Sequence, residues 1–411
     1  MTKKIVVTGI GATTPLGGTA ADSWKALLAG TSGASTIEAE WAAEHELPVT
    51  FAAQAAVSTA DVLARHETKR LDPSSQFALV AGREAWADAG APEVAPERLA
   101  VDWSTGIGGV WTLLDAWDTL RERGPRRVLP MTVPMLMPNG PGAAIGMDLH
   151  ARAGIRTVVS ACASSTEAIV NAYDHLQDGL ADMVIAGGSE AAIHPLPIAS
   201  FASMQALSRR NDDPAVASRP YDVSRDGFVL GEGAAALVLE TEEHAKARGA
   251  RIYAEVLGGA ITSDAYHITA PDPEGSAAAR AMIAAVRNAG ADLSDVRHIN
   301  AHATSTPVGD IAEYNALRRV FGDGLDDIAV TATKSSTGHL LGGAGAIEAM
   351  FTVLALSERV MPPTINLSEQ DPEIPLDVVT EPRPLGDGDA LAISNSFGFG
   401  GHNAVAAFRT A

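Results

Sequence analysis

Short apolar runs alternate along this chain with longer, alanine-rich stretches of helical character. Such alternation of strand and helix segments is typical of an α/β fold. In the first part of the chain it predicts a helix around Ser75–Ala89 and strands at Ile5–Ile10, Leu99–Trp103, Thr157–Ala161, Met183–Ala186, Ala235–Leu239 and Ile252–Leu257.

The same rhythm begins again after Leu257. It predicts helices near Ser276–Ala289 and Gly343–Leu356, strands at Val296–Ala301 and Ile328–Ala332, and a last strand pair at Leu376–Thr380 and Ala390–Ser394. We therefore expect two related halves, residues 1–257 and 258–411.

Three pairs of similar segments support an internal duplication. The pairs are Leu99–Gly106 with His298–Ser305, Val158–Thr166 with Val330–His339, and Met183–Glu190 with Leu391–Gly398. A duplicated α/β domain would bring equivalent strand ends together at a pseudo-twofold axis. The residues at those ends are therefore the candidates for chemistry.

Charge and cysteine content exclude several classes of protein. Lys and Arg total 30 against 50 Asp and Glu, a formal net charge of −20, so neither nucleic acid nor an anionic membrane is expected as the main partner. No apolar run is long enough to span a membrane, and the run Ile5–Val7 is too short for a signal peptide. Cys162 is the only cysteine, which excludes an internal disulfide and a cysteine-based metal cluster and favours a cytoplasmic location.

An acidic partner would have to dock on a local basic cluster. The candidates are Lys69 with Arg70, the run Arg121, Arg123, Arg126 and Arg127, and Arg209 with Arg210. The alternative for each is an ordinary solvated group of charges.

Cys162 lies where an apolar run gives way to small residues and then to a helical pattern. This order predicts a strand-to-helix corner, where the free N–H groups and the positive end of the helix dipole favour a thiolate. The alternative is a small buried hydrophobic residue with no chemical role.

Two histidines follow predicted strands in loops of small residues and glycines. They are His302, in the segment 300–310, and His339, in the segment 333–345. The glycine-rich segment Ser394–His402 forms a further strand end. Loops of this kind let the backbone approach a ligand closely. The alternative for Gly342–Gly345 is tight helix packing, and a phosphate loop is disfavoured because the Walker spacing is absent.

Several longer motifs occur in one order along the chain. They are Val7–Gly11, Gly106–Gly109, Ser218–Asp222, Arg225–Gly233, Ser263–His267 and Gly398–Asn403. With them the chain resembles the β-ketoacyl-acyl-carrier-protein synthases of the thiolase superfamily, specifically the elongating enzymes of type II fatty acid synthesis. The resemblance implies a thiolase-like fold, with the two halves forming αβαβα layers.

The resemblance also implies catalytic roles. Cys162 is expected to be the acyl-accepting nucleophile, and its backbone N–H and that of Phe399 are expected to form an oxyanion hole. His302 and His339 would bind the malonyl thioester carbonyl and stabilise the enolate left by decarboxylation. In the family, a pair such as Lys334 and Glu348 orients the second histidine; its alternative is a structural buried ion pair.

Binding roles follow from the same resemblance. Thr304 and Thr306 match residues that bind the phosphopantetheine arm. The fatty-acyl pocket and its gate match Ile107, Phe201, Gly398, Phe399, Gly400 and, on the facing loop, Asp264; a structural monovalent cation in some relatives matches Asn300, Glu348, Ser394 and Asn395. No metal or organic cofactor is expected to take part in the chemistry.

The expected activity is acyl transfer to Cys162 followed by decarboxylative Claisen condensation with malonyl-acyl carrier protein, in a cytoplasmic homodimer. One departure is Ala303, where the family usually has glycine. A thiolase would need a second catalytic cysteine, and priming ketosynthases pair histidine with asparagine. The alternatives are a type II polyketide ketosynthase and a catalytically silent interaction subunit.

Overall fold

The computed structural model describes residues 3–411. The strands are β1 Ile5–Thr13, β2 Ser35–Thr36, β3 Phe51–Ala52, β4 Leu99–Ser104, β5 Gly154–Arg156, β6 Met183–Glu190, β7 Gly233–Thr241, β8 Ala254–Ser263, β9 Val296–Asn300, β10 Ala329–Thr331, β11 Val360–Met361, β12 Asp377–Val378, β13 Arg383–Pro384, β14 Leu391–Gly398 and β15 His402–Thr410. The α-helices are α1 Ala20–Leu28, α2 Glu40–Glu44, α3 Arg65–Thr68, α4 Pro73–Asp88, α5 Val110–Arg123, α6 Thr132–Leu136, α7 Gly140–Asp148, α8 Ser164–Gln177, α9 Pro195–Ser203, α10 Glu242–Ala247, α11 Ser276–Asn288, α12 Pro307–Phe321, α13 Lys334–Thr337 and α14 Ala344–Glu358.

The main sheet has the same pattern of strand directions on both sides of its centre, with β12 as one additional strand at one edge. Its strand order is β12-β10-β9-β14-β15-β8-β1-β7-β6-β4-β5, and β1 and β8 meet antiparallel at the centre. From that junction each half has two antiparallel neighbours followed by parallel ones: β7, β6, β4 and β5 on one side, and β15, β14, β9 and β10 on the other. The predicted duplication is confirmed, and two of the three predicted segment pairs fall on equivalent strands, β4 with β9 and β6 with β14. The third pair is wrong, because Val330 lies in β10, whereas the segment after Val158 is the turn that leads into α8.

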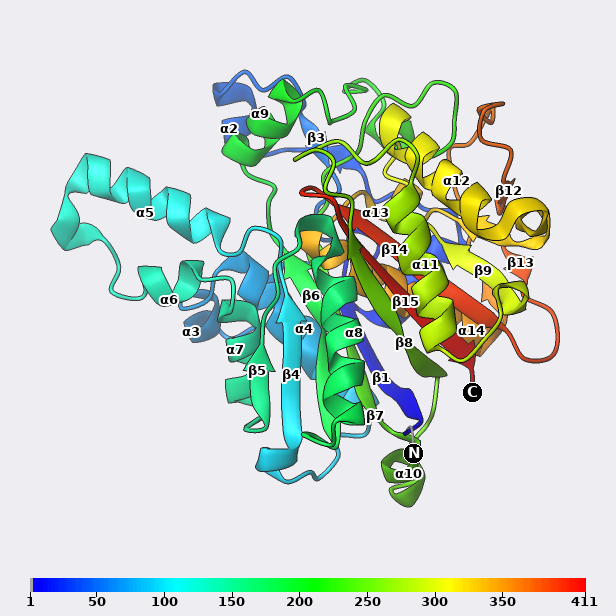
Figure 1. Ribbon diagram of the computed structural model, residues 1–411. Coiled ribbons are helices and arrows are strands. Elements are labelled where there is room, and N and C mark those ends of the chain that lie inside the picture. Colours follow the sequence, from blue (N-terminus) through cyan, green and yellow to red (C-terminus); the bar gives the residue numbers. More distant parts are fainter. Residues whose placement is uncertain (1–2) are drawn as a thin grey trace.

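Five layers result from the way helices cover the two half-sheets (Figure 1). The central helices α8 and α14 each contact strands of both halves, while α4 and α7 cover the first half-sheet and α11 and α12 cover the second. This is the expected αβαβα arrangement. The expected boundary after Leu257 falls inside β8, whose residues Ala254–Val256 pair with β1.

Helix α14 is central because nearly all its residues are small or apolar. Every residue from Ala344 to Leu356 is buried. The stretch Leu341–Glu358 has the length and mean hydropathy (1.2) of a membrane span, but 89% of it is buried inside the protein, as in the core helix of a soluble protein.

Two local predictions are wrong. Thr157–Ala161 is not a strand, because the chain leaves the sheet after Arg156 to form the turn that carries Cys162. The last two predicted strands do not pair with each other: β12 pairs with β10, whereas β14 lies between β9 and β15. Strand β15 was not predicted.

One segment projects from the layered body. Helices α5 and α6 form an arm that extends away from the sheet (Figure 1). The sheet ends on the same side with β5, whose outer edge has no neighbouring strand among the described residues.

Candidate active site

Cys162 lies in a short 3₁₀ turn, Ala161–Ala163, which we call the cysteine turn and which leads directly into α8. Ala161 has a φ of 51°, a conformation that alanine rarely adopts. Ser164 stabilises the turn, because its hydroxyl accepts the N–H of Ser160 at 2.9 Å and donates to the carbonyl of Ala161 at 2.6 Å. The predicted helix after Cys162 is confirmed, but the turn is not preceded directly by a strand, so the predicted strand-to-helix corner is only half right.

The thiol of Cys162 is not activated in the free protein. Burial raises its pKa to about 11, although the positive charge of Lys334 and the backbone N–H of Phe399 both act in the opposite direction. The expectation that the helix terminus alone favours a thiolate is therefore wrong. The thiol is therefore neutral at neutral pH, and it would have to lose its proton to act as a nucleophile.

A cavity of about 590 Å³ opens onto Cys162. Both halves of the chain line it, as the duplication predicts for equivalent strand ends. The predicted site residues on its wall are Ile107, Cys162, Phe201, Asp264, His302, Thr304, Thr306, His339, Gly398 and Phe399. Among the described residues, no cluster of His, Cys, Asp and Glu could hold a metal ion.

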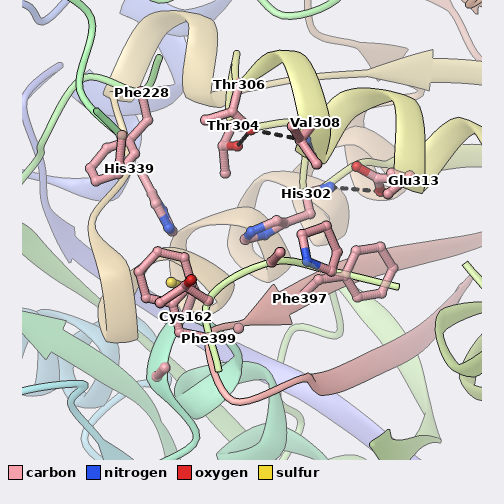
Figure 2. Close-up of a pocket in the computed structure, with 18 of the residues that line it drawn as sticks. Cys162, Phe228, His302, Thr304, Thr306, Val308, Glu313, His339, Phe397 and Phe399 are labelled. Atoms are coloured by element: carbon pink, nitrogen blue, oxygen red, sulfur yellow. Dashed lines mark hydrogen bonds between the residues drawn. The ribbon is translucent and has the colours of Figure 1, made fainter. Parts of the chain in front are cut away.

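His302 and His339 present their rings to the same cavity. Their ring centroids lie 5.3 Å apart and the rings are nearly perpendicular, at 87°. Phe228 packs edge-on against His339 at 5.4 Å, and Phe397 packs against His302 at 5.8 Å. Figure 2 shows the two imidazoles pointing into the cavity toward the side where Cys162 and Phe399 lie.

Lys334 holds His302 rather than His339. Its Nζ donates to the backbone carbonyl of His302 at 2.7 Å, lies 3.4 Å from Nδ1 of that ring and forms a buried ion pair with Glu348. The expectation that this pair orients the second histidine is wrong, because α13 places the ammonium beside the first. Since an ammonium can only donate, Nδ1 of His302 accepts and the ring proton lies on Nε2.

Both imidazoles are neutral. Burial lowers the pKa of His302 well below its ordinary value, and the charge of Lys334 and the neighbouring His339 lower it further. Burial and Lys334 lower the pKa of His339 in the same direction. A neutral His302 with its proton on Nε2 can donate a hydrogen bond into the cavity without carrying a charge.

The loop that carries His302 is held by Glu313, a residue that we did not predict. The carboxylate of Glu313 accepts the N–H of His302 at 2.9 Å, that of Ala303 at 2.7 Å and the amide of Asn395 at 3.1 Å. These bonds keep Ala303 at a φ of 24°, so the loop persists although glycine is absent. Nothing in the local sequence marks Glu313, whereas Phe228 lies within a motif that could have identified it.

Thr304 and Thr306 stand on the cavity wall opposite Cys162 (Figure 2). Their hydroxyls lie 3.0 Å apart, and that of Thr306 caps α12 by accepting the N–H of Gly309 at 3.2 Å. The expected contact to a phosphopantetheine arm stays a prediction.

The glycine-rich loop between β14 and β15 closes one side of the cavity. Gly398 packs so tightly that an added Cβ would lie 2.6 Å from the carbonyl oxygen of Ser160. Gly400, at a φ of 84°, does not line the cavity; its N–H donates to the backbone carbonyl of Ile268 at 2.7 Å. Asp264 faces this loop as expected, and its N–H donates to Gly401 at 2.9 Å.

One aliphatic and one aromatic residue expected in the acyl pocket, Ile107 and Phe201, both line the cavity. Phe201 packs edge-on against Phe228 at 5.4 Å. Ile107 lines the cavity and is 41% exposed in the single chain, so its outer side faces solvent.

Three of the four residues expected around a cation, Asn300, Glu348 and Ser394, are neighbours, and Asn395 follows Ser394 on β14 with its amide donating to Glu313. Ser394 and Asn300 are register partners on β14 and β9, and the side-chain amide of Asn300 donates to the carbonyl of Glu348 at 3.2 Å. Three buried oxygens have no hydrogen-bond partner within residues 3–411: Oε2 of Glu348, Oγ of Ser394 and Oδ1 of Asn395. Such an unsatisfied oxygen set fits a monovalent cation.

Known proteins resemble this chain over its whole length. The family model described as "Beta-ketoacyl synthase, N-terminal domain" matches residues 2–245, and "Beta-ketoacyl synthase, C-terminal domain" matches residues 253–368. A protein of Mycobacterium tuberculosis named 3-oxoacyl-[acyl-carrier-protein] synthase 2 is 48% identical over 98% of this chain and 96% of its own length. The protein of the same name from Synechocystis sp. is 45% identical over 99% and 98%.

Solved structures agree. A ketosynthase of a type II polyketide synthase, determined in complex with its acyl-carrier protein, is 31% identical and superposes with a TM-score of 0.92, with all of both chains covered. A β-ketoacyl synthase from Burkholderia phymatum is 35% identical, with a TM-score of 0.91 and the same full coverage. The chain belongs to the β-ketoacyl synthase family.

Proposed function

We propose that this protein is an elongating 3-oxoacyl-acyl-carrier-protein synthase of fatty acid synthesis. The observation that carries the proposal is the meeting of one buried thiol, Cys162, and two neutral imidazoles, His302 and His339, on a single largely apolar cavity. The named relatives at 43–48% identity support the same activity.

The first step transfers an acyl group to Cys162. Its sulfur attacks the carbonyl of an acyl-carrier-protein thioester, a new sulfur–carbon bond forms, and the pantetheine thiolate leaves and takes up the thiol proton. The backbone N–H groups of Cys162 and Phe399 can stabilise the tetrahedral oxyanion. The high pKa of Cys162 makes this stabilisation necessary, because little free thiolate exists at neutral pH.

The second step removes carbon dioxide from malonyl-acyl carrier protein. The thioester carbonyl accepts hydrogen bonds from His302 and His339 while Thr304 and Thr306 hold the pantetheine arm. The carbon–carboxylate bond breaks, its electron pair forms the enolate, and the two donors stabilise the developing oxyanion. Neutral donors suit this task. A positively charged imidazolium would attract the malonyl carboxylate and hinder its loss as carbon dioxide, whereas a neutral imidazole does not.

The third step joins the two chains. The enolate carbon attacks the acyl carbonyl on Cys162, and collapse of the tetrahedral intermediate expels the Cys162 thiolate, which takes up a proton. The product is a 3-oxoacyl chain on the carrier protein, two carbons longer than the acyl group.

Replacing the nucleophile separates these steps. Cys162→Gln should abolish condensation and leave or raise malonyl decarboxylation, because an amide carbonyl can occupy the oxyanion hole but offers no nucleophile. Cys162→Ala serves as a control that lacks both groups. Carbon dioxide and ketoacyl product are measured in one reaction, and loss of both together would contradict the proposed division of labour.

A polyketide ketosynthase is the second candidate, because two structural neighbours at 30–31% identity are the ketosynthase of a type II polyketide synthase and the ishigamide ketosynthase with its chain length factor. Acyl-carrier proteins of graded length distinguish the two: release of product after one condensation supports fatty acid elongation, and uninterrupted repeated condensation supports the rival. Absence of a stable thioester on Cys162 would instead indicate a silent subunit.

A monovalent cation at Asn300, Glu348, Ser394 and Asn395 is part of the proposal. The supporting observation is the set of three unsatisfied oxygens, which a cation would neutralise and hold in place without entering the chemistry. Potassium chloride should raise the melting temperature above that in choline chloride at equal ionic strength. Ser394→Ala should lose that increment, whereas Ser357→Ala, exposed at the end of α14, should keep it.

We also propose a cytoplasmic homodimer that uses acyl carrier protein as its partner. The outer edge of β5, which pairs with no strand in the described part of the chain, supports the dimer, since apolar side chains beside it are exposed: Ile155 by 40%, Val159 by 52% and Met147 by 69%. A free strand edge flanked by apolar groups favours pairing with a second copy. Light scattering should give twice the chain mass, and Ile155→Asp should give the monomer.

A further inference from the structure

The internal duplication assigns a counterpart to each residue near Cys162. Strands β6 and β14 each have eight residues, and β7 and β15 each have nine. The last residue of β6, Glu190, pairs with Gly233 just as the last residue of β14, Gly398, pairs with His402. Glu190 is therefore the counterpart of Gly398.

The cysteine turn has a counterpart as well. Leu341–Gly343, which we call the glycine turn, is a three-residue 3₁₀ turn that leads directly into α14. Its first residue, Leu341, has a φ of 46°, close to the 51° of Ala161. Gly342 thus occupies in the second half the place of Cys162 in the first.

The two halves differ in what faces these turns. Beside the cysteine turn, Gly398 has no side chain, and the N–H of Cys162 remains available to a substrate carbonyl oxygen. Beside the glycine turn, the carboxylate of Glu190 accepts the N–H of Gly342 at 3.0 Å. In the second half, the Glu190 carboxylate therefore occupies the position beside the turn N–H. In the first half, the corresponding position is left open for a substrate oxyanion.

The same carboxylate reaches the wall of the acyl pocket. It accepts the hydroxyl of Thr105 at 2.8 Å and the N–H groups of Gly106 at 2.8 Å and Ile107 at 3.3 Å. Glu190 is completely buried, and Gly106, Ile107 and Leu341 all line the cavity. Four donors from both halves thus converge on one buried carboxylate.

We propose that Glu190 is a positioning residue for the acyl pocket: it ties the Gly106–Ile107 wall to the glycine turn and thereby sets how the enzyme responds to acyl-chain length. Its removal would free the peptide of Ile107 on the cavity wall, and we expect long acyl tails to contact that wall more than short ones. The inference concerns the pocket of the proposed function and rests on that function for its kinetic consequence.

The direct test is backbone hydrogen exchange in Glu190→Gln. The side-chain amide of glutamine offers one acceptor where the carboxylate offered two, so segments 104–108 and 341–343 should exchange at least about tenfold faster. Glu84→Gln is the matched control, because Glu84 also joins two segments by accepting N–H groups, those of Ala12 at 2.7 Å and Ala20 at 3.0 Å, away from the cavity. Unchanged exchange in Glu190→Gln would overturn the proposal.

The kinetic test uses acyl-carrier proteins of graded length. In Glu190→Gln, kcat/KM should fall about tenfold or more for long acyl chains and less than about threefold for short ones, whereas Glu84→Gln should change all lengths by one common factor. An equal loss at every length in Glu190→Gln would overturn the proposal.

If Glu190→Gln does not fold, Thr105→Val removes one donor with little change of shape and should shift the length profile in the same direction. Failure of the wild-type enzyme to condense would refute the proposed function, while hydrogen exchange would still decide whether Glu190 holds the two segments.

Discussion

At the scale of single residues, the state of Cys162 depends on a balance between burial and nearby positive groups. A cysteine before a helix is expected to lose its proton readily, but here desolvation exceeds the effects of Lys334 and the Phe399 N–H. The thiol therefore stays neutral in the resting protein. In the proposed mechanism its reactivity would come from the oxyanion hole during the reaction rather than from a resting thiolate.

This balance predicts the pH dependence of alkylation. With a pKa of about 11, only about one thiol in a thousand is ionised at pH 8. Because the thiolate is the reactive form, the rate of iodoacetamide modification of Cys162 should rise about tenfold per pH unit from pH 7 to pH 10. Mass spectrometry of the modified peptide measures the rate, and a plateau near pH 8 would contradict the high pKa.

The buried pair of Lys334 and Glu348 gives a second prediction with a defined sign. Burial raises the pKa of Glu348 to about 7, and Lys334 opposes that rise, so Lys334→Met should raise it further. A carboxyl group whose folded pKa is raised stabilises the fold below its unfolded pKa and loses that effect as pH rises through the folded value. Lys334→Met should therefore cost about 3–5 kcal/mol at pH 8 and clearly less at pH 5.5.

A double variant separates stability from activity. Lys334→Met with Glu348→Gln removes both charges, so urea unfolding at pH 8 should show most of the lost stability restored. Decarboxylation should remain impaired, because the carbonyl and Nδ1 of His302 still lack their donor. Recovery of both properties would show that the pair is only structural.

At the scale of elements, the sequence predicts well whatever depends on local pattern. Strands such as β4, β6 and β9 and helices such as α11 and α14 are confirmed because their apolar runs are clear and bounded. The meeting of Cys162, His302 and His339 is predictable from the duplication, which brings corresponding segments of the two halves together, although Cys162 lies in a turn outside the sheet rather than at a strand end. Local pattern does not reveal which strands become neighbours, so the predicted pairing of the last two strands is wrong.

The elements that were missed have weak or misleading local signals. Strand β15 is rich in alanine, which has little preference for strands, and it is held by β8 and β14 on either side. Thr157–Ala161 looks like a strand but lies where the chain must leave the sheet. Glu190 and Glu313 accept hydrogen bonds from segments that only the folded chain brings near them. No spacing in the sequence identifies such a buried carboxylate.

The segment Gly106–Ile107 provides the prediction at this scale. Ile107→Phe adds bulk to the cavity wall, and overpacking an apolar site costs about 1–3 kcal/mol, which is roughly 5- to 150-fold in rate for a tail that reaches it. The variant should keep its rate with short acyl chains and lose it with chains of medium and greater length. An equal loss at every length would mean that Ile107 supports the fold or the nucleophile instead.

At the scale of the whole molecule, the large negative charge must be reconciled with an acidic carrier protein. A net charge of −20 repels such a partner at long range, so binding requires a local basic surface. Lys69 and Arg70 are exposed at the end of α3, whereas Arg210 is engaged with Asp226 at 3.8 Å. Arg126 and Arg127 are exposed in the connection between α5 and α6, at the tip of the projecting arm (Figure 1).

Charge reversal at the tip of this arm tests the docking surface. Arg126→Glu with Arg127→Glu should raise the KM for acyl-carrier protein, because each added carboxylate repels an acidic partner, and should leave turnover of a small acyl thioester unchanged, because neither residue lines the cavity. Wild-type turnover with carrier protein should weaken as salt rises, since salt screens exposed charges. The double variant should lose much of that salt dependence. Unchanged kinetics would move the docking surface to Lys69 and Arg70, for which the same reversal and the same small-thioester control apply.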